Sequence, residues 1–178
     1  MIVKSSLFRY NIMCKGRVSS MKRKSILIFV LIFTFICSIA SAARPSVTAD
    51  DSYFDPDIGQ YVLTGNVVIT INDRIITADS ARFSPITMEV WGDNGVSFQQ
   101  DGITFTGGNV YVQGSIRTAY IGGGSHFSRD GLTITSDTAS FNWKTKLATF
   151  DGNVTITQNG QTWTTDHQEY DVRANILH

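Results

Sequence analysis

The sequence predicts an all-β fold built from stacked two-stranded repeats, and three observations support this prediction. Apolar and polar residues alternate in stretches such as 67–71 and 132–135, which is the pattern of strands with one buried face. Gly, Asn and Asp interrupt these stretches, and no stretch shows the period of an amphipathic helix. The third observation is an internal repeat with a constant step of 29 residues.

The repeat consists of sequence columns that keep this step without gaps. A Thr recurs in every unit, an Asp follows two positions later in four of the five units, and a large apolar residue follows six positions after the Thr. The columns are Thr48, Thr77, Thr106, Thr135 and Thr164; Asp50, Asp79, Asp137 and Asp166, with Gly108 in the third unit; and Phe54, Phe83, Val112, Phe141 and Tyr170. Turn-forming pairs lie upstream at Gly65-Asn66, Asn94-Gly95, Gly123-Gly124 and Gly152-Asn153.

Each unit is predicted to contain two strands joined by a polar turn such as Asn72-Asp73 or Asn159-Gly160. Within the second strand, Ile76 and Ala78 point to one face, but strict alternation would place the apolar residues Ala81 and Phe83 on the opposite face. A bulge or bend at 77–79 resolves this conflict. We expect the repeated Asp to accept backbone N–H groups at that bend, which is a structural role.

A two-stranded unit cannot bury its apolar face alone, so the units are expected to stack. Consecutive antiparallel strands then form two facing sheets, and their inward columns form one continuous apolar interior. The sequence leaves open whether side chains fill this interior or line a groove for a ligand. The strands at the two ends of the stack are expected to lack pairing partners.

The charges divide the chain into a leader, residues 1–42, and one β domain, residues 43–178. Before residue 40 there are seven basic and no acidic residues, whereas residues 43–178 contain 8 basic and 15 acidic residues and carry a formal charge of −7. Lys22 to Lys24 precede an apolar stretch that ends in Ala40-Ser41-Ala42, which predicts a signal peptide cleaved after Ala42. Translation is expected to start at Met21, or the signal has a long basic region.

Both cysteines, Cys14 and Cys37, fall in this leader, so the mature domain is predicted to have no disulfide, thiol nucleophile or thiolate metal site. Its acidic balance disfavours nucleic acid as a partner.

Motifs for catalysis or metal binding are weak, and we expect structural roles for them. The segment 122–126 is interpreted as a flexible turn, Asp166-His167 as surface residues of a strand, and 55–59 as an Asx/Pro turn. The sequence therefore predicts no enzyme, no cofactor and no metal site.

Three stretches of the chain carry the repeat most clearly: YVLTGNVVITINDRIITADSARF (61–83), LATFDGNVTITQNGQTWTTDHQEYD (147–171) and, in part, VTADDSYFD (47–55). They resemble the LptA/OstA family of periplasmic lipopolysaccharide-transport proteins. The resemblance implies a semi-closed β-jellyroll without enzymatic activity that binds the lipid A part of lipopolysaccharide in its interior. Gly107-Gly108 departs from the family's small-Asp pair, which puts the bend of the third unit in doubt.

The resemblance also implies a place in outer-membrane biogenesis. It implies end-to-end strand pairing with an inner-membrane LptC-like protein and an outer-membrane LptD-like translocon, and head-to-tail self-association. The chain ends at His178 soon after Tyr170, and we expect its final strand to be free for such docking.

Under this interpretation, inward-facing residues would contact the acyl chains and arginines at the rim would contact phosphate. The expected lining is Val67, Ile69, Ile76, Phe83, Phe98, Phe105, Phe127, Ile134, Phe141, Ile156 and Trp163, and the candidate phosphate contacts are Arg44, Arg74 and Arg82. Two alternatives stay open. In the first alternative, the leader is retained and the protein is a membrane-anchored, LptC-like partner of the same pathway. In the second, the chain is a structural β-repeat surface protein with a solid core.

Overall fold

The computed structural model describes residues 45–178, whose regular elements are all β-strands, which confirms the predicted all-β class. The strands are β1 (Ser46–Thr48), β2 (Asp51–Asp55), β3 (Gln60–Ile71), β4 (Arg74–Ser84), β5 (Glu89–Gln100), β6 (Ile103–Gln113), β7 (Thr118–Gly122), β8 (Ser125–Arg129), β9 (Leu132–Ser136), β10 (Thr138–Asn142), β11 (Leu147–Gln158), β12 (Gln161–Asp171) and β13 (Ile176–Leu177). This part of the chain has no helix long and apolar enough to cross a membrane. The predicted leader, Cys14, Cys37 and Arg44 lie outside the described residues.

Each long strand takes part in two sheets because it bends in its middle. Between β3 and β4, Tyr61–Thr64 pairs with Ser80–Phe83, and Val67–Ile71 pairs with Arg74–Ala78, with a register shift between the two blocks. Equivalent shifts occur between β4 and β5, β5 and β6, and β11 and β12. The shift in β4 lies between Thr77 and Ser80 and confirms the bend predicted at 77–79.

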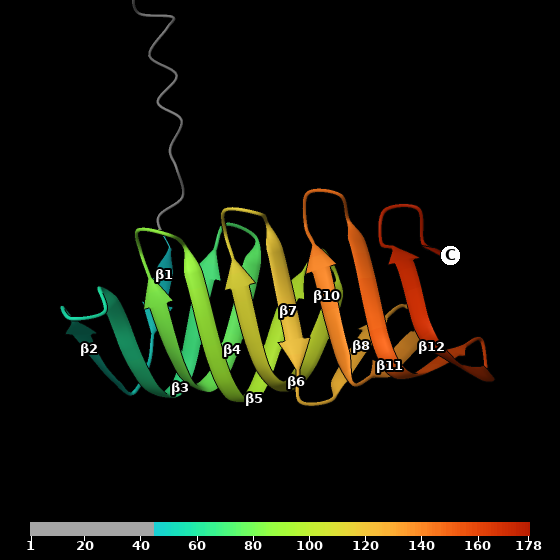
Figure 1. Ribbon diagram of the computed structural model, residues 1–178, viewed down its shortest axis with the longest axis horizontal. Helices are drawn as coiled ribbons and strands as arrows, with labels where there is room; N and C mark the ends of the chain where they lie inside the picture. The colour runs from blue at the N-terminus through green and yellow to red at the C-terminus, as the bar shows by residue number, and fades with distance from the viewer. Residues whose placement is uncertain (1–44) are drawn as a thin grey trace, which may run out of the picture. The chain divides into compact units, whose positions relative to one another are not determined.

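The bends divide one antiparallel network into two facing sheets. Sheet I contains β2, β7, β10, β13, the N-terminal halves of β3, β5 and β11, and the C-terminal halves of β4, β6 and β12. Sheet II contains β1, β8, β9 and the remaining halves. Figure 1 shows the strands following one another in chain order with the bends along the lower side. Two sheets joined along a line of bends form the predicted β-jellyroll.

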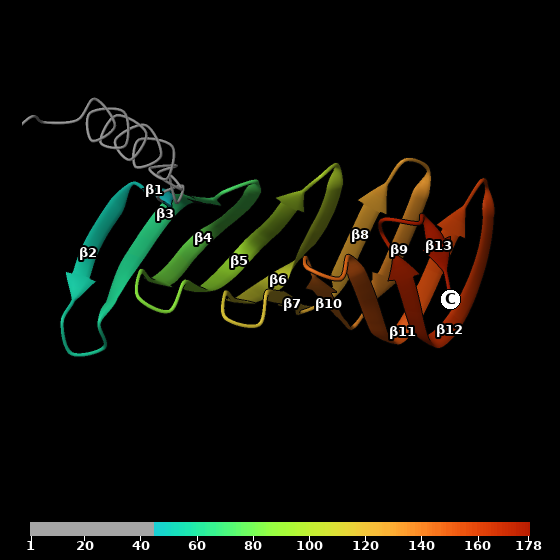
Figure 2. The same ribbon diagram turned by 90° about the horizontal axis from the view of Figure 1, so that it is seen from above.

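Two rows of turns connect the strands at the side opposite the bends. Sheet I has the four-residue turns 56–59, 85–88, 114–117, 143–146 and 172–175, and sheet II has the two-residue turns 72–73, 101–102, 130–131 and 159–160. Figure 2, seen from above, shows the sheet II turns along one long edge and the first three sheet I turns along the other, with the turns after β10 and β12 nearer the middle. We call the gap between the two rows the mouth.

The bends require residues that adopt left-handed backbone conformations. Gly65 and Asn66 have φ values of 73° and 48°, and Gly152 and Asn153 have φ values of 78° and 48°. Asn94-Gly95 and Gly123-Gly124 also have positive φ values. Gly and Asn tolerate this region better than other residues, which explains why these pairs recur with the period of the repeat.

Two residues of the Asp column, Asp50 and Asp137, stabilise the bends, although not through the donors that the sequence suggested. Asp50 accepts a hydrogen bond from the side-chain amide of Asn66, and Asp137 accepts one from Asn153, each at 2.8 Å. The prediction of backbone N–H donors is therefore wrong at these two positions. The reason is that the neighbouring strand presents its Asn side chain to the carboxylate, while a Cβ on Gly65 would lie 2.5 Å from Asp50 Oδ2.

The third unit bends despite the loss of its Asp. A Cβ on Gly108 would lie 3.2 Å from the Cα of Gly123, so the two backbones approach closely where other units place a carboxylate. The long strands opposite are divided here into β7 and β8, and into β9 and β10. Glycine on both sides thus replaces the Asp–Asn contact and keeps the bend.

Candidate functional site

The interior between the sheets contains ten of the eleven residues expected to line a lipid-binding groove. Each is at most 2% exposed: Val67, Ile69, Ile76, Phe83, Phe98, Phe105, Phe127, Ile134, Phe141 and Ile156. Trp163 differs, with 39% of its surface exposed. It lies directly opposite Ile156, so it faces the same side of the sheet, but β12 is the last strand of sheet II and nothing described covers the ring. Lipid contact by these residues stays a prediction.

Aromatic side chains fill the centre of the interior. The Phe105 ring lies 4.9 Å from the Phe127 ring, 5.7 Å from Phe141 and 6.1 Å from Phe150, measured between centroids. Phe105 and Phe127 belong to sheet II, whereas Phe141 and Phe150 belong to sheet I. The two sheets therefore contact each other through these rings, and a ligand would have to separate them.

The apolar interior reaches the surface at both ends of the jellyroll. At the N-terminal end, Phe54 and Tyr61 are paired across β2 and β3 and stack edge-to-face at 5.2 Å. Tyr61 lies opposite buried Phe83, so both rings face inward, although they are 49% and 41% exposed. At the other end, the exposed inward-facing ring is that of Trp163 in sheet II. Phe54 on β2 and Trp163 on the sheet II half of β12 thus have no described strand of their own sheet beyond them, whereas Tyr61 lies one strand further in.

The mouth is bridged by a few contacts between the two rows of turns. Lys146 Nζ in sheet I lies 2.6 Å from Asp101 Oδ2 in sheet II. The Arg74 guanidinium lies over the Trp143 ring at 4.7 Å from its centroid. Arg129 donates hydrogen bonds to the Val172 carbonyl and to a neighbouring tyrosine hydroxyl. These contacts hold the two sheets together on the side away from the bends.

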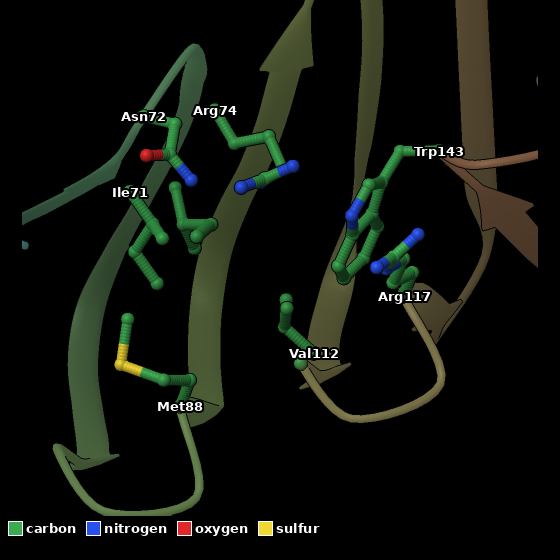
Figure 3. A pocket seen from close by; sticks show the side chains of 9 residues that line it. Ile71, Asn72, Arg74, Met88, Val112, Arg117 and Trp143 are labelled. Atoms are coloured by element: carbon green, nitrogen blue, oxygen red, sulfur yellow. The ribbon is translucent and has the colours of Figure 1, made fainter. Parts of the chain in front are cut away.

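A pocket of about 250 Å³ opens at the mouth beside these contacts, and Figure 3 shows its side chains. Its lining consists of Ile71, Asn72, Arg74, Ile76, Met88, Val112, Gly114, Arg117 and Trp143. The apolar members form a floor that continues into the interior, because Ile76 and Val112 are also core residues. In the view of Figure 3, the Trp143 indole stands between the Arg74 and Arg117 side chains.

Burial and nearby carboxylates set the electrostatics of this pocket. Burial lowers the pKa of Arg74, while Asp73 and Asp101 act in the opposite direction, and a guanidinium stays charged at neutral pH. Burial raises the pKa of Asp73, but the hydrogen bond from Gln100 and the charges of Arg74 and Lys146 outweigh it, so its pKa is lowered. Both groups are therefore ionised at neutral pH.

The three arginines expected to contact phosphate have separate positions. Arg74 lies in the pocket, whereas Arg82 lies over Trp91 at 5.5 Å from the ring centroid, on the outer face of sheet I. Arg44 is outside the described residues. Only Arg74 is therefore placed at the mouth.

Sequence reasoning missed Arg117 and Trp143, although the repeat contains a signal for the former. The last residue of each four-residue turn has a positive φ value and recurs with the same step: Gly59, Met88, Arg117, Lys146 and Asn175. Extending the columns into the turns would have placed Arg117 and Lys146 at equivalent positions beside the mouth.

The weak catalytic and metal motifs have structural positions. Asp55 accepts a hydrogen bond from the Asp57 backbone at 3.0 Å, which confirms the predicted Asx turn. His167 Nδ1 lies 2.6 Å from Asp151 Oδ1, and both side chains are more than half exposed. Residues 123–124 form the bend between β7 and β8. Within residues 45–178, no group of three His, Cys, Asp or Glu side chains is placed to hold a metal ion.

The described residues define an antiparallel two-sheet β-jellyroll whose apolar interior reaches both ends and one side. No protein-family model and no curated protein matches the sequence. Among solved structures, the chain is similar to LptH, the LptA-homologous periplasmic component of the lipopolysaccharide transport device from Pseudomonas aeruginosa. The two chains are 15% identical, the alignment covers 77% of this chain and 84% of LptH, and the TM-score is 0.34.

Proposed function

We propose that this protein is a periplasmic carrier of lipopolysaccharide that holds lipid A acyl chains between its two sheets and connects components of the inner and outer membranes. The observation that carries the proposal is the apolar interior that reaches the surface at both ends and at the mouth. The sequence resemblance to the LptA/OstA family supports the choice of lipid. Such a carrier adds no chemistry, and an energised partner supplies direction.

Entry of a lipid requires the two sheets to move apart. Exposed ion pairs at the mouth contribute only about 0–1 kcal/mol each, so the packed aromatic rings provide most of the resistance. Burial of an acyl chain of a dozen carbons is worth about 10 kcal/mol at roughly 0.8 kcal/mol per methylene. The acyl chain would replace the lost ring–ring contacts with its own apolar contacts. The free energy gained by burying it is therefore large enough to compensate for separating the rings.

The ends of the jellyroll fit partners that add a strand. Asp50 and Asp137 each bind the Asn of the bend that comes after them, but the described chain supplies no such bend after Asp166. The sheet II half of β12 also has a free edge. An LptC-like protein, an LptD-like translocon or a second copy arranged head to tail would extend the sheets there.

The compartment can be tested at the N-terminus of the exported protein. We expect mass spectrometry of the protein from an osmotic-shock fraction to give a mature chain that begins at Ala43, because Ala40-Ser41-Ala42 fits a signal peptidase site. A chain that begins at Met1 or Met21 and sediments with membranes would contradict the cleaved carrier and favour the anchored, LptC-like alternative.

Photo-crosslinking in living cells tests the ligand itself. With a photoreactive amino acid at Phe98 or Phe127, both fully buried in the interior, we expect capture of lipopolysaccharide. The matched control is Thr70, which neighbours buried Ile69 on β3 but faces outward. The packed Phe centre favours a second function, a structural β-repeat protein with a solid core. Absence of lipid at both Phe positions would support that function, and capture at Thr70 alone would indicate a sticky surface.

A further inference from the structure

We infer that the pocket at the mouth is a binding site for the phosphate headgroup of an acylated amphiphile, contacted by Arg74 and Arg117, which both line it beside Trp143. This inference rests on the proposed function as a lipid carrier and specifies where the charged end of the ligand lies. The lipid chain would continue from the pocket over Ile76 and Val112 into the interior.

The distribution of charge carries the first step. Residues 43–178 have a formal charge of −7, yet four of their eight basic residues lie in or beside the turns at this pocket: Arg74, Arg117, Lys144 and Lys146. Three carboxylates lie in or beside the same turns: Asp101 binds Lys146 at 2.6 Å, Asp73 lies 3.7 Å from Arg74 and accepts a hydrogen bond from Gln100, and Glu89 accepts hydrogen bonds from Thr87 and Tyr111, so the basic residues remain in excess. The pocket is thus a positive site on an acidic domain, which favours an anion.

Arg74 and Arg117 are available to that anion. Arg74 lies 3.7 Å from Asp73 without a hydrogen bond to it, and Arg117 forms no ion pair with any residue of the described range. The ring of Trp143 holds the Arg74 guanidinium in place at 4.7 Å. Two guanidiniums offer the forked donors that phosphate oxygens accept in pairs, which distinguishes this site from a site for a neutral sugar.

The size and lining of the pocket specify an amphiphile. At about 250 Å³ it is smaller than the roughly 300–1,000 Å³ of pockets that enclose whole drug-sized ligands, so it fits a headgroup and the start of a chain. Its floor is apolar, with Ile71, Ile76, Met88 and Val112 below the cationic rim. A free phosphate ion has no apolar part that could contact this floor.

The turn position of Arg117 suits a glycine substitution. Its φ value is 61°, in the left-handed region. The equivalent residues Gly59, Met88, Lys146 and Asn175 also have positive φ values, so this turn accepts several residue types, glycine among them. Replacing Arg117 with Gly therefore removes the guanidinium without straining the backbone.

Calorimetric titration of the purified protein with dodecyl phosphate, below its micelle concentration, tests the inference. We expect Arg117→Gly to weaken binding of dodecyl phosphate about tenfold, as loss of a charged hydrogen bond does, and to leave binding of neutral monolauroylglycerol unchanged. Glycine suits this turn, so the variant should melt no lower than the parent protein. Arg74→Gln should act in the same direction.

The matched control is Arg82→Gln, which removes the other arginine stacked on a tryptophan but lies on the outer face. Equal binding of the phosphate and neutral amphiphiles, unaffected by Arg117→Gly, would overturn the headgroup site and leave the carrier function standing. Binding of inorganic phosphate alone with the affinity of dodecyl phosphate would overturn the amphiphile. Failure to bind either amphiphile would instead reject the carrier function on which the inference rests.

Discussion

Replacing Phe105 with Ala should lower the free energy of unfolding by about 3–5 kcal/mol, as expected for a fully buried aromatic ring. Phe105 is 0% exposed, and its ring contacts those of Phe98, Phe127, Phe141 and Phe150, with centroid distances from 4.9 to 6.3 Å. Because these rings come from both sheets, the substitution leaves a cavity where the sheets meet. Equilibrium unfolding in urea measures the loss.

The control for this prediction is Tyr120→Ala on the outer face. Tyr120 is 43% exposed and stacks on Tyr111 at 6.1 Å, so its removal should cost less than about 1 kcal/mol. A similarly small loss for Phe105→Ala would contradict the packed centre and would mean that the two sheets are already apart in solution.

The fold could be predicted from the sequence because its bends and turns require particular residues. Gly65-Asn66 and Gly152-Asn153 recur with the repeat because both members of each pair have positive φ values. Alternation then identified the inward face, since every predicted lining residue except Trp163 is buried. Trp163 was not predicted as exposed because its exposure depends on whether another strand covers β12, which alternation within a strand does not encode.

The mouth could not be predicted in the same way. Trp143 lies against Arg74, and Lys146 against Asp101, although each pair is far apart in the chain and belongs to different sheets. Which turns of sheet I meet which turns of sheet II depends on how sharply each strand bends at its bulge. The repeat fixes where the chain bends but not the angle, so these pairings needed the three-dimensional structure.

Covalent closure of the mouth should abolish lipid loading. Residues 43–178 contain no cysteine, so Asp101→Cys together with Lys146→Cys introduces the only two thiols in this part of the chain. These positions face each other across the mouth, where the native side chains lie 2.6 Å apart. After reaction with a short bis-maleimide, we expect capture of lipid at Phe127 to fall at least tenfold, because the sheets can no longer separate.

The same double variant without the crosslinker should load lipid normally, because it loses only one exposed ion pair worth about 0–1 kcal/mol. A second control joins Ile86→Cys to Ile116→Cys, in neighbouring turns of the same sheet, where both native side chains are exposed. This crosslink restrains sheet I but leaves the mouth free, so loading should persist. If the closed mouth loaded lipid as well as this control does, acyl chains would have to enter through the open ends, past Phe54 and Tyr61 or past Trp163, and the sheets would not need to part along the mouth.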